Sequence, residues 1–348
     1  SIACSTRSRM ISLESLERAS RLLRQARRPL LVTHIAPDGD AAGSLLGLGW
    51  ALRALGKEPI LACQDPLPQR FAYLPGFDEV VSQPPDEPFD LLVVLDCSDP
   101  DRMGDRFQAL AGSSLPLLNI DHHRTNWGFG TAALVDEAAV STTHILYRLL
   151  RHMGLPVEER VATCLLTGLV TDTRGFRTAN VTADILRIAV DLMEAGAPLA
   201  EITQNGLDRR PLSTLRLWGA GLARLQVDDG VIWTSLPLSV QHATGHDGYG
   251  DAGLANLLVG AEEAHVAVVF TERPDGQVEV GFRATPGFDV SGVAQALGGG
   301  GHAMASGCLV PGPLEAAQQR VLALLREDLA RQRAAMGDER GWSKGSST

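Results

Sequence analysis

Acidic and imidazole side chains gather in one short stretch in the first half of the chain. The apolar residues 117–120 are typical of a buried strand, and Asp121, His122 and His123 follow them directly. A carboxylate beside two imidazoles offers hard and borderline metal ligands together with a proton carrier. Taken alone, a histidine pair that caps the following turn explains the triplet equally well. The residues at the other strand ends decide between a functional site and a turn cap.

Other apolar segments of the N-terminal half also end in acids or histidine. Strands are expected at 29–33 and 90–95, and a buried helix at 161–170. In an open α/β sheet, ligands bind at the carboxyl ends of the strands. We therefore expect one site that gathers the polar side chains at these ends, which are His34, Asp38, Asp40, Asp96, Asp121, His122, His123 and Asp172.

The donor atoms of this set indicate which metals it suits. Carboxylates and imidazoles without thiolates favour Mn²⁺, Mg²⁺ or Fe²⁺ over a structural zinc ion. Two such ions about 3.5–4 Å apart are a common solution for phosphoester hydrolysis, because they neutralise phosphate oxygens and lower the pKa of the attacking water. The residues alone thus point to metal-assisted hydrolysis.

Hydrophobic periodicity predicts an α/β fold, with a mostly parallel sheet flanked by helices in the N-terminal domain, residues 10–195. Residues 196–222 are interpreted as a linker with a Leu-rich helix, 223–335 as a smaller α/β domain with a mixed sheet, and 336–348 as a polar tail. The N-terminal domain is expected to have a further strand at 59–63 and helices at 12–28, about 44–55, 141–153 and 182–195. In the C-terminal part we expect strands at 222–228, 230–236, 264–271 and 277–283, and helices at 237–243, 251–258, 289–297 and 313–335.

Composition narrows the class of protein. The chain of 348 residues is long enough for two domains, and its net charge of −10 disfavours a protein that coats long nucleic acid. Five scattered cysteines argue against a disulfide framework and favour the cytoplasm. No window is apolar enough for a membrane span, and no export signal is expected. Met10 fits the natural start of the protein, with residues 1–9 added by cloning, and a native extension fits equally well.

At this point the sequence resembles the DHH phosphoesterases, a family named after its third motif. Four segments carry the resemblance: His34 to Ser44, Val94-Leu95-Asp96, Asp121-His122-His123 and Thr171-Asp172-Thr173. Phe282-Arg283 and Gly298-Gly299-Gly300-Gly301-His302 are similar to the DHH-associated domain that accompanies many members. The order and spacing of the motifs extend this resemblance from about residue 30 to 311.

The resemblance implies a role for each residue. One metal ion would be held by His34 and Asp38, and the other by Asp40, His122 and Asp172, with Asp96 bridging both. Asp121 would support its neighbours, and His123 would face the scissile phosphate as donor or acid. In the second domain, the terminal phosphate or base of the substrate would be held by Arg283, His302 and the backbone N–H groups of Gly299, Gly300 and Gly301. The active site would lie between the domains.

Simpler interpretations stay open for some of these residues. The glycine run could be only a flexible turn, Arg283 a surface residue, and Asp40 an N-cap of the following helix. Two positions depart from the family pattern: Arg174 stands where a glycine is expected, and Ala284 stands where a serine commonly follows the arginine. Arg174 could add a phosphate contact or narrow the cleft.

Within the family, the size and the glycine-rich motif are similar to the nano-RNases, which act on very short RNAs. The leading hypothesis is a phosphodiesterase with two Mn²⁺ ions, or Mg²⁺, that hydrolyses short oligoribonucleotides, linear dinucleotides such as pApA, 3′-phosphoadenosine 5′-phosphate or c-di-AMP. Long duplex nucleic acid and membranes are not expected as partners, and the resemblance implies a homodimer. The alternatives are a pyrophosphatase or exopolyphosphatase of the same superfamily and a catalytically silent nucleotide sensor.

Overall fold

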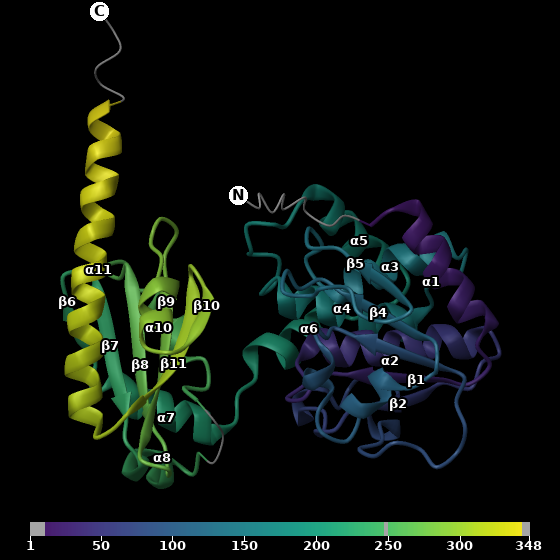
Figure 1. Ribbon diagram of the computed structural model, residues 1–348, viewed down its shortest axis with the longest axis horizontal. Coiled ribbons are helices and arrows are strands. Elements are labelled where there is room, and N and C mark those ends of the chain that lie inside the picture. Colours follow the sequence, from purple (N-terminus) through teal and green to yellow (C-terminus); the bar gives the residue numbers. More distant parts are fainter. Residues whose placement is uncertain (1–10, 247–249, 343–348) are drawn as a thin grey trace, which may run out of the picture. The chain divides into compact units, whose positions relative to one another are not determined.

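The chain forms two compact units, Ser1–Arg209 and Arg210–Thr348 (Figure 1). The computed structural model describes residues 11–246 and 250–342. Residues 1–9 and the end of the predicted polar tail lie outside these ranges. The division between the units falls within the segment 196–222 that the sequence predicts as a linker. Among the described residues, no helix has both the length and the apolar character that crossing a membrane requires.

A five-stranded, all-parallel sheet forms the centre of the first unit, in the order β2-β1-β3-β4-β5. Its strands are β1 (Pro29–Thr33), β2 (Ile60–Ala62), β3 (Leu91–Leu95), β4 (Leu117–Asp121) and β5 (Ala132–Val135). Strands β1 and β3 are buried at every position, as continuous apolar runs covered on both faces should be. The predicted parallel α/β fold is confirmed. Strand β5 is not predicted, because four small or apolar residues after a glycine-rich loop carry no periodic signal.

The α-helices pack on one face of this sheet, and 3₁₀ helices and loops cover the other face. The α-helices are α1 (Leu13–Gln25), α2 (Gly39–Ala54), α3 (Thr142–His152), α4 (Glu159–Asp172), α5 (Ala183–Glu194) and α6 (Leu199–Thr203), which continues as a π-helical turn, Gln204–Asp208. Short 3₁₀ helices lie at Gln69–Phe71, Phe77–Glu79, Pro100–Met103 and Gln108–Gly112. The larger core lies between the sheet and α2, α3 and α4, and a smaller one packs on the opposite face around Phe107 and Phe129.

Two glycines let helices α2 and α4 approach closely. A Cβ atom at Gly43 would lie 2.4 Å from the Cys164 carbonyl oxygen, and one at Gly168 would lie 2.4 Å from Asp40 Oδ1. Real Cβ atoms do not make such contacts, so larger residues would force the helices apart. The close packing brings the first turn of α2, which carries Asp40, near the end of α4, which carries Asp172.

The second unit is built on a mixed sheet of six strands, in the order β10-β11-β9-β8-β7-β6, in which only β7 and β8 pair in parallel. The strands are β6 (Gln226–Asp228), β7 (Val231–Leu236), β8 (Val266–Glu272), β9 (Gln277–Ala284), β10 (Gly300–His302) and β11 (Ala305–Pro311). The helices are α7 (Leu212–Leu222), α8 (Leu238–Thr244), α9 (Leu254–Leu258), α10 (Ser291–Ala296) and α11 (Leu314–Trp342). This confirms the predicted smaller α/β region with a mixed sheet.

Three details differ from the sequence-based expectation. The Leu-rich helix of the predicted linker, α7, belongs to the second unit, because Leu217 is buried in its core with Leu236 and Leu254. Helix α11 continues to Trp342, beyond the predicted end near 335. Part of the glycine run forms strand β10 rather than an open turn.

Arg174, the first departure from the family pattern, has a left-handed backbone conformation with φ of +53°. That region favours glycine, because a Cβ atom clashes with the following carbonyl group. Arg174→Gly is therefore expected to stabilise the first unit by about 0.5–1 kcal/mol, after allowing for the greater chain entropy of glycine. A thermal melt should show a midpoint raised by about 1–4 °C. Arg174→Ala is the control, since it keeps the Cβ atom, and equal midpoints for the two variants would contradict the explanation.

Candidate metal centre

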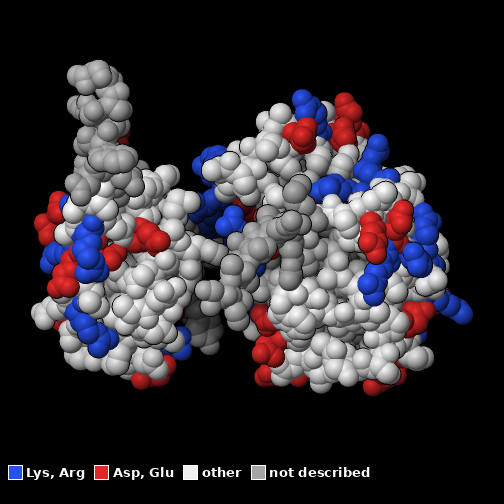
Figure 2. All heavy atoms as spheres, turned by 45° about the horizontal axis from the view of Figure 1, so that its top comes forward, with Lys and Arg blue, Asp and Glu red and all other residues white. Residues whose placement is uncertain are grey.

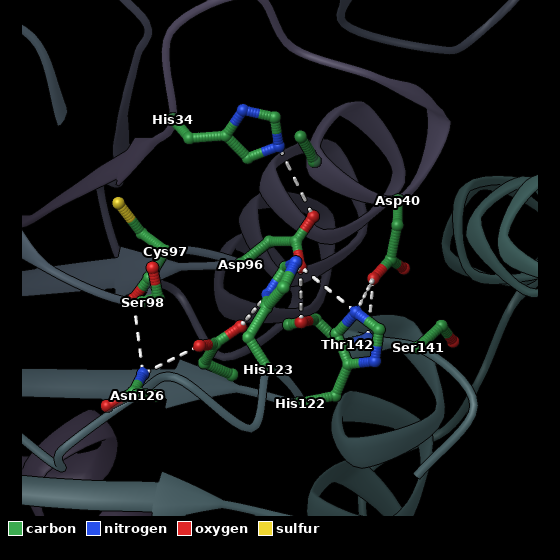
Figure 3. Close-up of polar contacts among 12 residues, drawn as sticks. His34, Asp40, Asp96, Cys97, Ser98, His122, His123, Asn126, Ser141 and Thr142 are labelled. Atoms are coloured by element: carbon green, nitrogen blue, oxygen red, sulfur yellow. Dashed lines mark hydrogen bonds and ion pairs between the residues drawn. The ribbon is translucent and has the colours of Figure 1, made fainter. Parts of the chain in front are cut away.

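The eight acids and histidines predicted at the element ends come together at the carboxyl edge of the parallel sheet. Three groups have ligand atoms that all lie within 4.8 Å of one another: His34 with Asp38 and Asp96, Asp40 with His122 and Asp172, and Asp96 with His122 and His123. Asp96 and His122 each belong to two groups. In Figure 3, Asp96 lies at the centre, with His34 on one side and the histidine pair on the other. These groups could hold two neighbouring cations.

Asp96 connects the groups. It follows β3 with a left-handed φ of +56°, which points its carboxylate into the cluster. Its oxygens lie 3.5 Å from His34 Nε2, 3.6 Å from His122 Nε2 and 3.7 Å from His123 Nδ1. The Thr142 hydroxyl donates to Asp96 Oδ1 at 2.8 Å. Burial would raise the pKa of Asp96, but the hydrogen bond from His34 and the neighbouring imidazoles hold it well below its usual range.

Asp40 is fixed by the N-terminus of helix α3. Its carboxylate accepts from the backbone N–H groups of Thr142, at 2.5 Å, and Thr143, at 3.0 Å, and from the Thr143 hydroxyl at 2.8 Å. The side chain that caps α2 is Asp38, which accepts from the backbone of Asp40 and Ala41, so the N-cap interpretation of Asp40 is wrong. The roles of Thr142 and Thr143 are not predicted from the sequence. The only signal for them is that Ser141 predicts a helix start there, whose free N–H groups attract a carboxylate.

Asp121 orients His123, and its carboxylate is not exposed to the centre of the cluster. Its Oδ1 lies 2.7 Å from His123 Nδ1, and its Oδ2 accepts from the Asn126 side chain at 2.6 Å. Burial lowers the pKa of His123, but the Asp121 hydrogen bond and charge outweigh burial and raise it to about 9. Asn126 is a second residue that sequence reasoning missed, because an asparagine in a loop carries no signal of its own. Both Asp121 oxygens are thus engaged within the chain.

His34 is oriented in a similar way. Its Nδ1 lies 2.8 Å from the Ile35 carbonyl oxygen, which places a proton on Nδ1 and leaves Nε2 facing Asp96 and Asp38. The Arg102 guanidinium lies 3.3 Å from the same Nδ1 and is a third neighbour that the sequence did not predict. The ring is therefore held with Nε2 directed at the cluster.

The charges of this donor set fit divalent cations. Burial and the mutual repulsion of the carboxylates raise the pKa values of both Asp40 and Asp172 well above the usual range. Such a concentration of buried carboxylates is unfavourable without a compensating positive charge. The nearby thiols do not compete as ligands, because Cys63 and Cys97 direct their sulfur atoms at backbone carbonyls and burial raises the pKa of Cys63 to about 12.

The predicted substrate residues all lie in the second unit, on strand β9, on the edge strand β10 and at the residue before β10. Arg283 and His302 stand in one row across the sheet, with Ala305 between them. A cavity of about 710 Å³ is lined by Arg283, Gly299 and Gly300, whereas Gly301 and His302 do not line it. The Gly299 N–H donates to the Ala294 carbonyl oxygen, so the predicted anion-binding nest lacks this donor.

Charges on the surface are mixed. In Figure 2, acidic and basic side chains are interspersed over the right-hand part of the first unit. This distribution agrees with the net charge of −10. In this part of the face shown, Lys and Arg do not form the continuous band on which proteins that coat long nucleic acid depend.

Comparisons with known proteins agree with both units. Residues 29–169 match the DHH family, N-terminal domain, and residues 250–331 match the DHHA1 domain. The chain is 35% identical over 323 residues to the bifunctional oligoribonuclease and PAP phosphatase NrnA of Thermus thermophilus, covering 91% of this chain and 95% of that protein. It is 28% identical to the NrnA of Bacillus subtilis, with 81% and 88% covered. The crystal structure of an exopolyphosphatase-related protein from Bacteroides fragilis superposes with a TM-score of 0.84 at 23% identity, covering 95% of this chain and all of that one.

Proposed function

The chain belongs to the DHH family, and we propose that it is a metal-dependent phosphoesterase that hydrolyses short oligoribonucleotides. Linear dinucleotides such as pApA, 3′-phosphoadenosine 5′-phosphate and c-di-AMP are the further candidate substrates. The observation that carries the proposal is the convergence of three ligand groups on Asp96 and His122. The name of the Thermus relative, an oligoribonuclease and PAP phosphatase, supports the class of substrate.

We assign two ions to the cluster, with Mn²⁺ preferred and Mg²⁺ as the substitute. His34 and Asp38 would hold one ion, Asp40, His122 and Asp172 the other, and Asp96 both, in agreement with the distances among their ligand atoms. Bound there, divalent cations would neutralise phosphate oxygens and lower the pKa of the attacking water. The DHH unit would thus be catalytic, and the DHHA1 unit would hold the substrate.

The chain's own side chains would complete the reaction. The hydrogen bond and charge of Asp121 raise the pKa of His123, so its imidazolium form can give a proton to the leaving oxygen of the phosphodiester. Asp121 holds the imidazole in the orientation that this transfer requires. In the second unit, the Arg283 guanidinium, which lines the cavity, would pair with a substrate phosphate, with the nearby His302 and glycine backbone assisting.

The compartment and the assembly state are also part of the proposal. The described cysteines, Cys63, Cys97, Cys164 and Cys308, are all free and buried, as expected in a reducing compartment such as the cytoplasm. We propose a homodimer, to be tested by light scattering on the full chain. A monomeric mass at micromolar concentration would contradict that assignment.

A substrate panel tests the proposed function. The protein with Mn²⁺ should hydrolyse a pentaribonucleotide, and at least one of pApA, 3′-phosphoadenosine 5′-phosphate and c-di-AMP, faster than a long RNA duplex. Pyrophosphate and polyphosphate are the comparison substrates. Faster release of orthophosphate from either would favour the pyrophosphatase or exopolyphosphatase alternative. Tight binding of the nucleotides without turnover in Mn²⁺ would favour the sensor.

A further inference from the structure

Three glycines stand side by side on one face of the second sheet. In the strand register, Gly281 of β9 pairs with Gly307 of β11, which pairs with Gly300 of β10. A Cβ atom at Gly300 would meet nothing within 4 Å, and one at Gly281 would only touch Asp251 Oδ2 at 3.9 Å. Neither glycine has a positive φ, so the packing and conformation of the chain do not require glycine at these two positions. Together they leave a flat strip of bare backbone.

Charged side chains of opposite sign stand at the two ends of this strip. Along β9, Arg283 and Glu279 occupy the same face as Gly281, one on each side of it, while Val280 and Phe282 point into the core. Successive positions on one face of a strand are about 7 Å apart. Both side chains and all three glycines line the cavity of about 710 Å³. The cavity thus has a glycine floor with a cation at one end and an anion at the other.

The charged side chains at the two ends differ in the hydrogen bonds that they make within the chain. The Arg283 Nε donates to the Asn256 side chain at 2.7 Å, and Nη1 donates to the Phe282 carbonyl oxygen, so the guanidinium is held in place. Within residues 11–246 and 250–342, the half-buried Glu279 carboxylate makes no hydrogen bond or ion pair. Arg273, at the same end, pairs instead with Asp275.

Asp251, the other acid that lines the cavity, already has hydrogen-bond donors for both of its oxygens. Both Asp251 oxygens accept backbone N–H groups in the turn that starts α9, from Gly253 at 2.9 Å and Ala255 at 2.7 Å. Of the two carboxylates that line the cavity, Glu279 is therefore the one that remains for a ligand. A half-buried carboxylate is stabilised most by a hydrogen-bond donor inside the same cavity.

We propose that the glycine strip is a slot for a flat nucleobase and that Glu279 selects bases that carry an exocyclic amino group. The base lies over Gly281, Gly307 and Gly300, its amino group donates to the Glu279 carboxylate, and the phosphate of the same nucleotide faces Arg283. Adenine presents an amino group where hypoxanthine, of the same size and shape, presents a carbonyl oxygen that a carboxylate repels. This inference rests on the proposed function for its substrate class and adds the base preference.

Binding of AMP and IMP to the full, metal-free chain tests the slot without catalysis. In calorimetry, the wild-type protein should bind AMP about tenfold or more tightly than IMP, since a hydrogen bond to a charged group is at stake. Glu279→Gln should bring the ratio close to one, because an amide can both accept from adenine and donate to hypoxanthine. Gly281→Ala should weaken AMP binding about tenfold while the unfolding midpoint stays unchanged or rises, since the added methyl group enters only the slot. Gly292→Ala, in open space on α10, is the matched control.

The outcomes separate this inference from the proposed function. An AMP to IMP ratio that Glu279→Gln leaves unchanged, or normal AMP binding by Gly281→Ala, would overturn the slot whatever the enzyme hydrolyses. Failure to hydrolyse any nucleotide of the panel would remove the phosphoesterase assignment, while the binding ratios would still decide the slot. If the slot and the phosphoesterase assignment are both correct, kcat/KM for pApA should exceed kcat/KM for its inosine analogue. Glu279→Gln should make the two kcat/KM values about equal.

Discussion

Asp96→Asn is expected to lower kcat/KM for a pentaribonucleotide by about three orders of magnitude. Asp96 belongs to two of the three ligand groups, with oxygens 3.5 Å from His34 Nε2 and 3.6 Å from His122 Nε2. Asparagine keeps the size of the side chain and tolerates the left-handed φ of +56°, so the fold should survive. The substitution removes the negative charge that both ions would share.

The measurement pairs kinetics with Mn²⁺ calorimetry and a thermal melt in EDTA. The variant should bind Mn²⁺ more weakly and with fewer sites, while its metal-free unfolding midpoint changes little. Asp101→Asn is the matched control, because Asp101 is an exposed acid five positions along the chain and belongs to none of the ligand groups. Retention of more than about a tenth of the activity, or of two tight Mn²⁺ sites, would contradict the assignment of Asp96 as the shared ligand.

His123→Ala is expected to lower kcat about a hundredfold to a thousandfold with little change in KM, because it removes the proposed proton donor. Asp121→Asn should have a smaller effect, about tenfold to a hundredfold, since the imidazole remains but loses the carboxylate 2.7 Å away that orients and charges it. Both variants should keep two Mn²⁺ sites. A nucleotide ester with a p-nitrophenolate leaving group needs no proton, so its hydrolysis should suffer much less.

An exposed histidine at the end of α3 supplies the control, and His152→Ala should leave both substrates unaffected. Equal losses with the ribonucleotide and the p-nitrophenyl ester would show that His123 does not act as the acid. Because His123 also lies 3.7 Å from Asp96, loss of a Mn²⁺ site in His123→Ala would instead make it a metal ligand.

The candidate metal centre could be predicted because its residues follow a rule of topology. Parallel strands deliver their carboxyl ends to one edge, so Asp96 and Asp121, which are far apart in the sequence, are expected to meet. The residues that hold them could not be predicted in the same way. Thr142 matters only because α3 starts beside Asp40, and Asn126 only because its loop returns to Asp121. Neither contact produces a hydrophobic period or a motif spacing that could be recognised in the sequence.

The second unit shows the same division between pattern and packing. Its strands could be predicted from alternating residues such as Val278, Val280 and Phe282, which face the core. The glycine run was ambiguous, because glycine suits a turn, a nest and a strand equally. The strand register decides, by pairing Gly300 with Gly307 and leaving the run partly extended.

The anchoring of Asp40 by the start of α3 also determines when the centre can exist. Its ligands extend from His34 to Asp172, and the groups that hold Asp40 come from a helix made long after it. A nascent chain that has not yet released α3 and α4 from the ribosome therefore lacks both a ligand and the support of another. Metal uptake would then report the completion of the first unit, before the second unit has been synthesised.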